Sequence, residues 1–414
     1  MITALRGMKD IIDDAPKYQR ILNTAIDCAK RYGFSLIETP ILEETALFKR
    51  SVGESSDIIG KESYQFIDKG GLDVSLRPEG TAGVVRAFIE KKLDRSNATH
   101  RFFYHGAMFR YERPQKGRHR TFHQFGVESF GEKSVYEDAA IIALARDIFD
   151  SLDIAYNLEI NSLGCPNCMP SYKNKLVRFL ENHSTDLCDD CKRRKDTNPI
   201  RALDCKNEAC QKIYQNAPLI ADYFCGECKS DFETLQTILA HNGIKFAHNK
   251  KLVRGLDYYN KTAFEFVSKD IGTQSAIAGG GRYDKLVEQL GGKPTFAVGF
   301  ALGVERIYDL VDSPKEGREK EGREGVYIGA IDPSAIDDVF QYATRLRKKI
   351  KTFVEYEPKK LAAHLKNADR LNAKICAVIG EDERKSGAIW IKNLESGAES
   401  KPQLNEWLKA ITND

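Results

Sequence analysis

Hydrophobic and polar positions follow two different periods in the N-terminal part of the chain. From residue 17 to residue 32, apolar side chains recur three and four positions apart, which predicts an amphipathic helix that stops at Gly33. Residues 34–39 then predict a strand. Pro40 closes this strand, because proline has no N–H group to donate to a sheet.

Two strands rich in phenylalanine and tyrosine are predicted at 101–112 and 121–130, joined by a loop that contains proline, glycine and several cations. Side chains alternate between the two faces of a strand, so one face of the second strand presents Phe122, Gln124, Gly126 and Glu128. The glycine leaves a slot in which a ligand can approach the backbone. On the incoming strand Arg110 and Glu112 share a face. A strand with one water-facing side produces the same alternation.

The middle of the chain continues with helices and further strands. Helical periodicity covers 136–150 and 171–182. Residues 252–267 and 274–287 mix aromatic residues with glycines, which favours strands around a ligand-facing surface. Residues 297–311 predict a strand or tight turn that enters a helix.

The last part of the chain differs in its composition and in its pattern of apolar residues. Residues 313–324 contain few apolar side chains and many charges and glycines, which predicts a linker. Beyond it, the runs GVYIGAI and AKICAVIG predict buried strands, with helices at 334–350 and 358–371. This alternation is typical of a small α/β domain with a mixed sheet.

Composition narrows the class of protein. With 414 residues, 42% of them hydrophobic and 30% charged, the chain is long enough for two to three globular domains. A net charge of +3 does not by itself indicate a nucleic-acid partner. The apolar runs are too short to span a bilayer, and the N-terminus lacks the apolar core of a signal peptide. We therefore expect a cytoplasmic protein with no membrane contact.

Positive charge is concentrated in one short region. Residues 101–120 contain one acidic residue, Glu112, and six lysines and arginines: Arg101, Arg110, Arg113, Lys116, Arg118 and Arg120. Arginine presents a planar fork that suits phosphate oxygens, so this excess favours a polyphosphate or nucleic-acid site. A solvated charged loop is the alternative.

Three glycine-containing motifs also carry an arginine. They read RGLDYY at 254–259, AGGGRYD at 278–284 and GFALGVER at 299–306. None is a dinucleotide fingerprint or a Walker A loop, which need other spacings. Gly299 and Gly303 lie one helical turn apart and would permit close packing.

Eight of the ten cysteines form four pairs. Nineteen residues separate the first pair from the second, a spacing typical of a four-cysteine zinc site, and four pairs suffice for two such sites. Reduced structural thiols are the alternative, and an iron–sulfur cluster fits the spacing less well. The candidate ligands for a structural zinc are Cys165, Cys168, Cys188, Cys191, Cys205, Cys210, Cys225 and Cys228. Cys28 and Cys376 lie in apolar patterns and are expected in the core.

Together these segments resemble the class II aminoacyl-tRNA synthetases, and among them the histidyl-tRNA synthetase family, over nearly the whole chain. The helix and strand that end at Pro40 resemble motif 1, residues 109–128 motif 2 and residues 299–306 motif 3, and LRPEGT at 76–81 is shared with the family. LVRGLDYYNKTAFEF at 252–266 and AGGGRYD at 278–284 are similar to its two histidine-specific signatures.

The resemblance implies an α+β fold. Its parts are an antiparallel catalytic sheet flanked by helices, a helical, cysteine-rich insertion domain and a C-terminal α/β anticodon-binding domain. The expected boundaries are 1–164 and 251–312 for the catalytic domain, 165–250 for the insertion, 313–324 for the linker and 325–414 for the anticodon-binding domain. A homodimer built around motif 1 is also implied.

The resemblance further implies a histidine–tRNA ligase that uses ATP with Mg²⁺, L-histidine and tRNA(His). By motif match, Arg110 contacts the α-phosphate, and Arg118 and Arg306 hold the β- and γ-phosphates of a bent ATP. Glu112 and Phe122 frame the adenine, with Phe122 stacked on it.

The same resemblance assigns the amino-acid pocket. Arg254 is the expected catalytic cation, with Arg110, and lies beside the α-phosphate and the histidine carboxylate. Glu79 and Thr81 suit the α-amino group, and Glu128 and Tyr259 suit the two imidazole nitrogens. Gln115 is a candidate reader of the tRNA acceptor end. The full set expected to hold histidine is Glu79, Thr81, Gln124, Glu128, Arg254, Tyr258, Tyr259 and Tyr283.

Three other functions fit parts of the sequence. A non-catalytic, synthetase-like regulatory subunit would lose signature residues and the C-terminal domain, and a non-catalytic tRNA-sensing protein would not need the arginines. Arg110, Arg254 and Arg306 are all present here. A zinc-dependent nucleic-acid-binding protein would leave the ATP-site residues unexplained.

Overall fold

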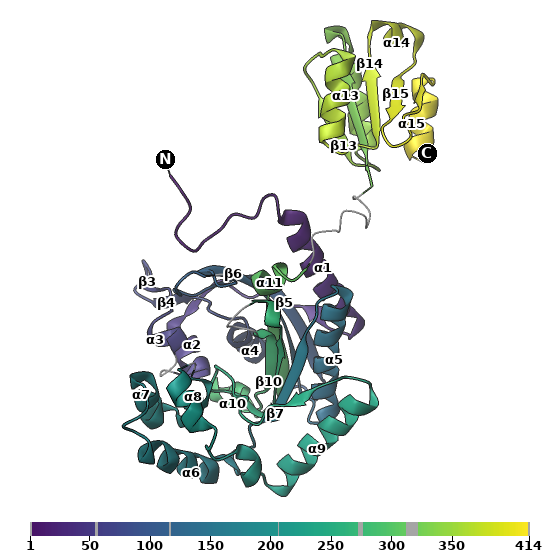
Figure 1. The fold of residues 1–414 in the computed structure, drawn as a ribbon. Coiled ribbons are helices and arrows are strands. Elements are labelled where there is room, and N and C mark those ends of the chain that lie inside the picture. Colours follow the sequence, from purple (N-terminus) through teal and green to yellow (C-terminus); the bar gives the residue numbers. More distant parts are fainter. Residues whose placement is uncertain are drawn as a thin grey trace. The chain divides into compact units, whose positions relative to one another are not determined.

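The chain forms two compact units, Met1–Val311 and Asp312–Asp414. The computed structural model describes residues 2–53, 57–115, 117–205, 207–271, 276–311 and 322–412 (Figure 1). The predicted linker at 313–324 lies outside these residues except for its last three positions. Within the described ranges no helix is long and apolar enough to cross a membrane.

The first unit is built on a sheet whose described strands number eight, in the order β1-β5-β6-β11-β10-β9-β7-β8. The inner six run antiparallel, while β1 and β8 pair in parallel with β5 and β7. The expected antiparallel catalytic sheet is therefore confirmed, with a parallel strand added at each edge. The strands are β1 (Ser35–Leu36), β5 (His100–Phe109), β6 (Thr121–Phe130), β7 (Asn157–Ser162), β8 (Ala247–His248), β9 (Asn260–Val267), β10 (Ala276–Arg282) and β11 (Ala297–Gly303).

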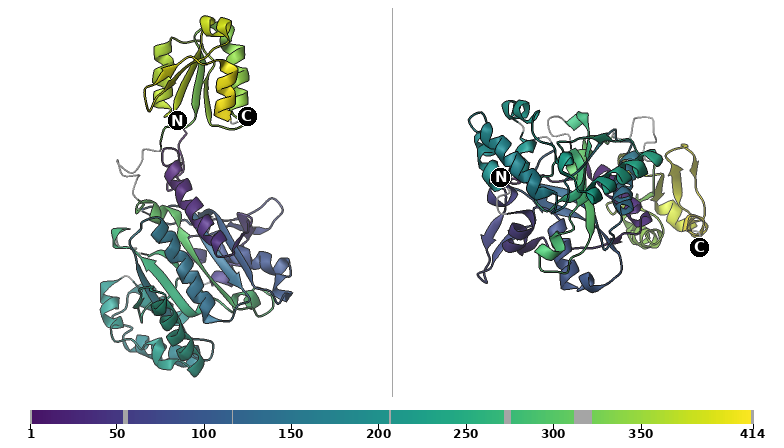
Figure 2. Two further views of the ribbon diagram at one scale, coloured as in Figure 1. Left: turned by 90° about the vertical axis from the view of Figure 1, so that its right-hand side faces the viewer. Right: turned by 90° about the horizontal axis from the view of Figure 1, so that it is seen from below.

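Long helices cover one face of this sheet. They are α1 (Ala15–Arg31), α5 (Val135–Ser151) and α9 (Gly226–His241), and Figure 2 shows α5 lying across the strands. The predicted helices at 17–32 and 136–150 are confirmed. Phe125 and Val127 of β6 are fully buried in the core with these helices. The residues that alternate with them on β6 therefore face the opposite side of the sheet.

The opposite face carries shorter elements and leaves room for a cavity. Val84 and Phe88 of α4 (Thr81–Glu90) pack there with Leu286 of α10 (Leu286–Gln289). Beside them lies a small sheet in the order β2-β4-β3. The remaining elements here are α2 (Thr45–Val52), α3 (Asp57–Gly60), η1 (Leu93–Arg95), β2 (Leu42–Glu44), β3 (Gln65–Ile67) and β4 (Asp73–Leu76).

The segment between β7 and α9 is helical and has its own core. It contains α6 (Met169–Asn182), α7 (Asp189–Thr197), η2 (Pro199–Asp204), α8 (Glu208–Tyr214) and η3 (Ile220–Tyr223). Leu176, Leu180 and Tyr214 are fully buried in this core together with cysteines. The helix predicted at 171–182 is confirmed as α6.

The second unit contains a mixed sheet in the order β13-β12-β14-β15-β16. β12 is parallel to β13 and β14, and β15 is antiparallel to β14 and β16. The two predicted strands are confirmed as β12 and β14, and the two predicted helices as α12 and α13. The elements are β12 (Val326–Ala330), η5 (Pro333–Ala335), α12 (Ile336–Leu346), β13 (Thr352–Glu355), α13 (Leu361–Arg370), β14 (Ile375–Ile379), α14 (Glu381–Ser386), β15 (Trp390–Asn393), β16 (Glu399–Ser400) and α15 (Leu404–Thr412).

Two predictions around the glycine motifs were partly wrong. The strand predicted over 252–267 begins only at Asn260, and the RGLDYY motif before it is a loop without strand pairing. Gly299 and Gly303 lie on strand β11 rather than one turn apart on a helix, which begins at Val304 as α11 (Val304–Tyr308). The prediction of a strand that enters a helix at 297–311 is confirmed. Residues 274–275 of the strand predicted at 274–287 lie outside the described residues.

A buried ion pair joins the sheet to the helical layer. Arg282, at the end of β10, donates from Nε to both carboxylate oxygens of Asp138 on α5, at 3.0 and 2.8 Å. The side chain of Arg282 is 3% exposed and that of Asp138 is 0% exposed. The arginine of the AGGGRYD motif is therefore a structural link between two layers.

We predict that Asp138→Ala lowers the free energy of unfolding by about 3 kcal/mol, because the buried guanidinium loses its closest carboxylate and keeps only the longer ion pair with Asp284. Urea denaturation measures this change. The control is Lys285→Ala, which breaks an exposed pair with Glu288 and should cost less than about 0.5 kcal/mol. Equal unfolding midpoints for the two variants would contradict the prediction.

Candidate active site

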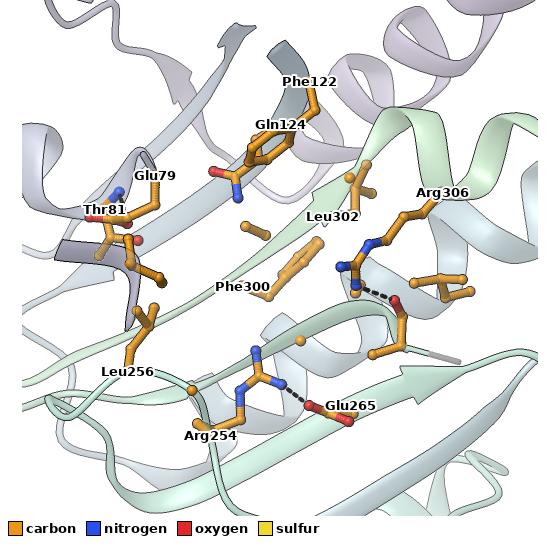
Figure 3. Close-up of a pocket in the computed structure, with 18 of the residues that line it drawn as sticks. Glu79, Thr81, Phe122, Gln124, Arg254, Leu256, Glu265, Phe300, Leu302 and Arg306 are labelled. Carbon is orange, nitrogen blue, oxygen red and sulfur yellow. Dashed lines mark hydrogen bonds and ion pairs between the residues drawn. The ribbon is translucent and has the colours of Figure 1, made fainter. Parts of the chain in front are cut away.

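A cavity of about 350 Å³ opens on the sheet face opposite α1 and α5. Strands β6, β10 and β11 form its floor (Figure 3), and residues of the loop between β5 and β6 and of the loop at 254–259 also line it. Most of the residues expected to bind ATP or histidine line it. These are Glu79, Thr81, Arg110, Glu112, Arg118, Phe122, Gln124, Glu128, Arg254, Tyr258, Tyr259 and Arg306.

Two expected site residues lie outside the lining. Tyr283 is fully buried behind it, and its hydroxyl donates a hydrogen bond to Glu128. Gln115 lies in the loop between β5 and β6, where it pairs backbone to backbone with Arg118 at 3.1 and 2.9 Å. Lys116 of the same loop lies outside the described residues.

Three guanidinium groups meet at one end of the cavity. Glu112 Oε2 lies 3.0 Å from Arg118 Nη1, and Glu112 Oε1 lies 3.9 Å from Arg110 Nη1. Arg306 donates from Nη1 to the carbonyl oxygen of Ala276 at 2.8 Å. Burial and then the charges of Arg118 and Arg110 lower the pKa of Arg306 to about 10. The carboxylates of Glu112 and Glu265 raise this pKa by less than burial and the two cations lower it, so this end of the cavity favours an anionic ligand.

Arg254 lies on the floor of the cavity and comes from the RGLDYY loop. It forms an ion pair with Glu265 of β9, and its guanidinium carbon lies 5.5 Å from the centre of the Tyr259 ring. A Cβ atom at Gly279 of β10 would lie 2.4 Å from Arg254 Nη1. The glycine is therefore needed for the guanidinium to lie flat across β10, which gives the AGGG motif a physical reason.

The other end of the cavity is a small polar pocket around Glu128. Thr81 Oγ1 donates to Glu128 Oε1 at 2.7 Å. Burial raises the pKa of Glu128 to about 8, so this carboxyl group favours the protonated form at neutral pH. The nearby Gln124 Oε1 is buried and has no hydrogen-bond partner among the described residues. A pocket with an unpaired acceptor and a protonated carboxyl group suits a small polar ligand.

Glu79 and the tyrosines complete this pocket. The Glu79 carboxylate accepts hydrogen bonds from the backbone N–H groups of Thr81 and Ala82, at 2.7 and 2.9 Å, in the first turn of α4. The rings of Tyr258 and Tyr259 lie 4.7 Å apart between centroids. The helix terminus and the ring packing therefore hold these groups in position.

The ligand slot expected above Gly126 does not exist. A Cβ atom at Gly126 would lie 2.4 Å from the Tyr104 hydroxyl, so the ring of Tyr104 on β5 fills this space. The glycine makes room for a tyrosine of the neighbouring strand. The alternation of Phe122, Gln124 and Glu128 toward the cavity is nevertheless present.

Sequence reasoning missed residues that shape the site. Glu265, the partner of Arg254, is a charged residue between two fully buried phenylalanines of β9, and that alternation was an available signal. Asp204 belongs to η2, in the helical segment between β7 and α9, and also lines the cavity. Nothing in the local sequence indicates that this helical segment reaches the cavity.

The raised pKa of Glu128 predicts a pH-dependent difference between wild type and Glu128→Gln. The folded chain keeps this proton up to about pH 8, whereas the unfolded chain loses it near the ordinary value of 4.5. The wild type is therefore expected to lose thermal stability relative to Glu128→Gln as pH rises from 5 to 8. Thermal unfolding midpoints of both proteins from pH 5 to 9 measure this, with Glu90→Gln, exposed on α4, as the control. Parallel profiles for wild type and Glu128→Gln would contradict it.

Sequence comparison assigns the chain to a known family. The family model described as histidyl-tRNA synthetase matches residues 7–307, and that described as an anticodon binding domain matches residues 325–414. A histidine–tRNA ligase from a Nitratiruptor species is 60% identical over 410 residues, covering 99% of each chain. One from Campylobacter concisus (strain 13826) is 59% identical over 412 residues, covering 99% of this chain and 100% of its own.

Solved structures agree with the sequence comparison. Apo S. aureus histidyl-tRNA synthetase matches with a TM-score of 0.83 at 33% identity, covering 100% of both chains. A histidyl-tRNA synthetase from Nostoc sp. PCC 7120 shares the fold at 18% identity, with a TM-score of 0.67 over 100% of this chain and 99% of its own. The α+β fold expected from the resemblance is confirmed, and the chain belongs to the histidyl-tRNA synthetase family.

Proposed function

We propose that this cavity carries out both steps of histidine–tRNA ligation. In the first step a carboxylate oxygen of histidine attacks the α-phosphorus of ATP, the bond to the bridging oxygen breaks, and pyrophosphate leaves. In the second, a hydroxyl of the terminal tRNA ribose attacks the carbonyl carbon of histidyl-adenylate, loses its proton and displaces AMP. One observation carries the proposal: arginines from three remote segments line the same cavity as a small polar pocket.

ATP would occupy the cationic end. Arg110 would contact the α-phosphate, and Arg118 and Arg306 the β- and γ-phosphates, because Glu112 offsets only part of the positive charge of these guanidinium groups. Phe122 lines the same region, with the guanidinium carbon of Arg110 5.2 Å from the ring centre, and would stack on adenine beside Glu112. Mg²⁺ would enter with the triphosphate, because it keeps oxygen ligands and is usually bound through substrate phosphates.

Arg254 would provide a fixed cation between the two substrates. Its ion pair with Glu265 and its contact with Gly279 hold the guanidinium in place before any ligand binds. Negative charge builds up on the α-phosphoryl group as the bond forms, so a preorganised cation there lowers the barrier. No enzyme nucleophile is needed for this chemistry. Arg254 and Arg110 are thus the proposed catalytic residues.

Histidine would occupy the polar pocket, with its α-amino group near Glu79 and Thr81. Glu128 and Tyr259 would pair with the two imidazole nitrogens, and Gln124 offers an unpaired buried oxygen beside them. An aliphatic amino acid would leave these buried polar groups unsatisfied. Such a pocket rejects the wrong side chain strongly.

The tRNA would be bound by separate parts of the chain. The second unit, which matches the anticodon-binding family model, would contact the anticodon of tRNA(His). Gln115, in the loop next to Arg118, would approach the acceptor end. The catalytic domain would comprise 1–164 and 251–312, interrupted by an insertion domain at 165–250.

A homodimer through the motif 1 region is part of the proposal, as is a cytoplasmic location. Large apolar side chains are exposed on this segment: Leu36 is 56% exposed, Ile41 46% and Leu42 40%. Exposed apolar clusters of this kind are typical of interaction surfaces. The relatives at 59–60% identity carry the ligase name, and no comparison supports the alternative of a regulatory or tRNA-sensing protein.

We predict that Arg254→Ala lowers histidine-dependent ATP–pyrophosphate exchange by about 100-fold or more, because a fixed cation at the reacting phosphorus is lost. Arg254→Lys should recover only part of the activity, since lysine lacks the planar fork. Circular dichroism and thermal unfolding check that each variant is folded.

The matched control is Arg193→Ala, which removes an exposed arginine of α7 that pairs with Asp190. Its exchange rate should equal that of the wild type. Near-normal exchange by a folded Arg254→Ala variant would contradict the proposed role. Exchange by the wild type with amino acids other than histidine would contradict the proposed specificity.

A further inference from the structure

Eight cysteines gather into two groups of four in the first unit. Within each group all four Sγ atoms lie within 4.8 Å of one another. We call Cys165, Cys168, Cys225 and Cys228 the outer cluster, and Cys188, Cys191, Cys205 and Cys210 the inner cluster. The grouping is nested, because the outer pairs enclose the inner pairs along the chain. Sequence spacing had joined the first pair to the second, and the structure contradicts this.

The fold explains the nesting. Cys165 and Cys168 follow strand β7, and Cys225 and Cys228 begin helix α9, so the outer cluster lies where the insertion leaves and rejoins the catalytic sheet. The inner cluster lies among α7, η2 and α8, inside the insertion. Spacing along the chain cannot reveal which pairs meet, because intervening helices bring distant pairs together.

The sulfur separations match four ligands of one tetrahedral ion. A zinc–sulfur bond of about 2.3 Å sets the sulfur–sulfur edge of a tetrahedron at about 3.8 Å. Sγ of Cys165 lies 3.6 Å from that of Cys168 and 3.9 Å from that of Cys225. In the inner cluster Sγ of Cys188 lies 3.7 Å from that of Cys205. A disulfide would require about 2.0 Å, and all ten cysteines are free.

Backbone N–H groups point at these sulfurs as they do around metal-bound thiolates. The N–H of Cys225 donates to Cys168 Sγ at 3.1 Å, and that of Cys188 to Cys210 Sγ at 3.3 Å. The N–H of Asn207 donates to Cys205 Sγ at 3.4 Å. Such donors stabilise sulfur that carries negative charge and fix the orientation of metal ligands.

We propose that each chain binds two structural zinc ions, one in the outer and one in the inner cluster. Four protein sulfurs close each site and leave no position for substrate, which is typical of structural zinc. The cysteines of an iron–sulfur cluster bind different iron atoms of the cluster. Eight thiols in two compact groups of four therefore fit two single ions, and a zinc ion needs no redox partner.

The positions of the clusters indicate what the two ions hold together. Next to the outer cluster, the N–H of Leu163 donates to the carbonyl oxygen of Lys261, and that of Lys261 to Gly164, both at 2.7 Å. Next to the inner cluster, Asn198 Nδ2 donates to Asp257 Oδ1 at 2.7 Å. Both contacts reach the chain that flanks Tyr258 and Tyr259. The two ions would therefore hold the loop that carries Tyr258 and Tyr259 in position. A role of this loop in binding histidine rests on the proposed function, whereas the metal sites themselves do not.

Metal analysis of the untagged, full-length protein, purified under reducing conditions without added metal, tests the proposal. We expect two zinc ions per chain, and X-ray absorption should show only sulfur neighbours at about 2.3 Å. A chain with no bound zinc, a single zinc ion, or iron in place of zinc would overturn it. None of these readouts depends on activity, so the proposed function can fail while the metal sites stand.

Serine substitution of whole clusters tests the nesting. Replacing all four outer cysteines should leave one zinc ion per chain, and replacing all four inner cysteines should also leave one. If the pairs were joined in chain order, either variant would damage both sites and retain none. The control is Cys28→Ser with Cys376→Ser, which alters the two cysteines outside the clusters and should leave two zinc ions.

Partial zinc removal from the wild type also tests which cysteines share a zinc ion, and it does not depend on a variant that folds. A chelator is added in steps, exposed thiols are alkylated, and the modified cysteines are identified by mass spectrometry. Alkylation should appear in groups of four that match the outer and inner clusters. Groups that mix cysteines of the two clusters, or alkylation of all eight before any chelator is added, would overturn the proposal.

Discussion

Buried positive charge that the nearby carboxylates only partly balance is the constraint on which this structure depends. Arg306 is held in a cavity with Arg110 and Arg118, and its pKa falls to about 10 because burial and the neighbouring cations disfavour its charge. Glu112 compensates only part of that charge. A triphosphate would supply the missing negative charge, so the cost of collecting these arginines is recovered when the ligand binds.

The rest of the first unit holds these cations in position. The ion pair between Arg282 and Asp138 fixes β10 against α5, on the face away from the cavity. On the cavity face the missing side chain of Gly279 lets Arg254 cross the same strand. The two arginines of the histidine-specific signatures therefore have different roles: Arg282 joins two layers of the fold, and Arg254 lies in the cavity. Replacing either would impair the protein for different physical reasons.

Local periodicity was sufficient to predict α1, α5, β5 and β6, because the apolar pattern of each element is complete within its own residues. It failed wherever the decisive contact comes from another segment. The slot above Gly126 is filled by Tyr104 of the neighbouring strand. The loop at 254–259 has the aromatic and glycine content of a strand but pairs with none. Which cysteine pairs come together depends on how the helices between them fold, and their spacing along the chain does not reveal it. The candidate binding residues of the cavity were predicted from a family resemblance, whereas only the fold reveals that Glu265 and Asp204 line it.

The most direct test of the account is a crystal structure of the chain with histidine and an ATP analogue whose α,β-bridging oxygen is replaced by a methylene group. The account predicts a triphosphate within about 3 Å of the guanidinium groups of Arg110, Arg118 and Arg306. It also predicts an imidazole ring beside Glu128 and a histidine carboxylate next to Arg254. A triphosphate bound outside this cavity, or in contact with none of the three arginines, would contradict the central claim.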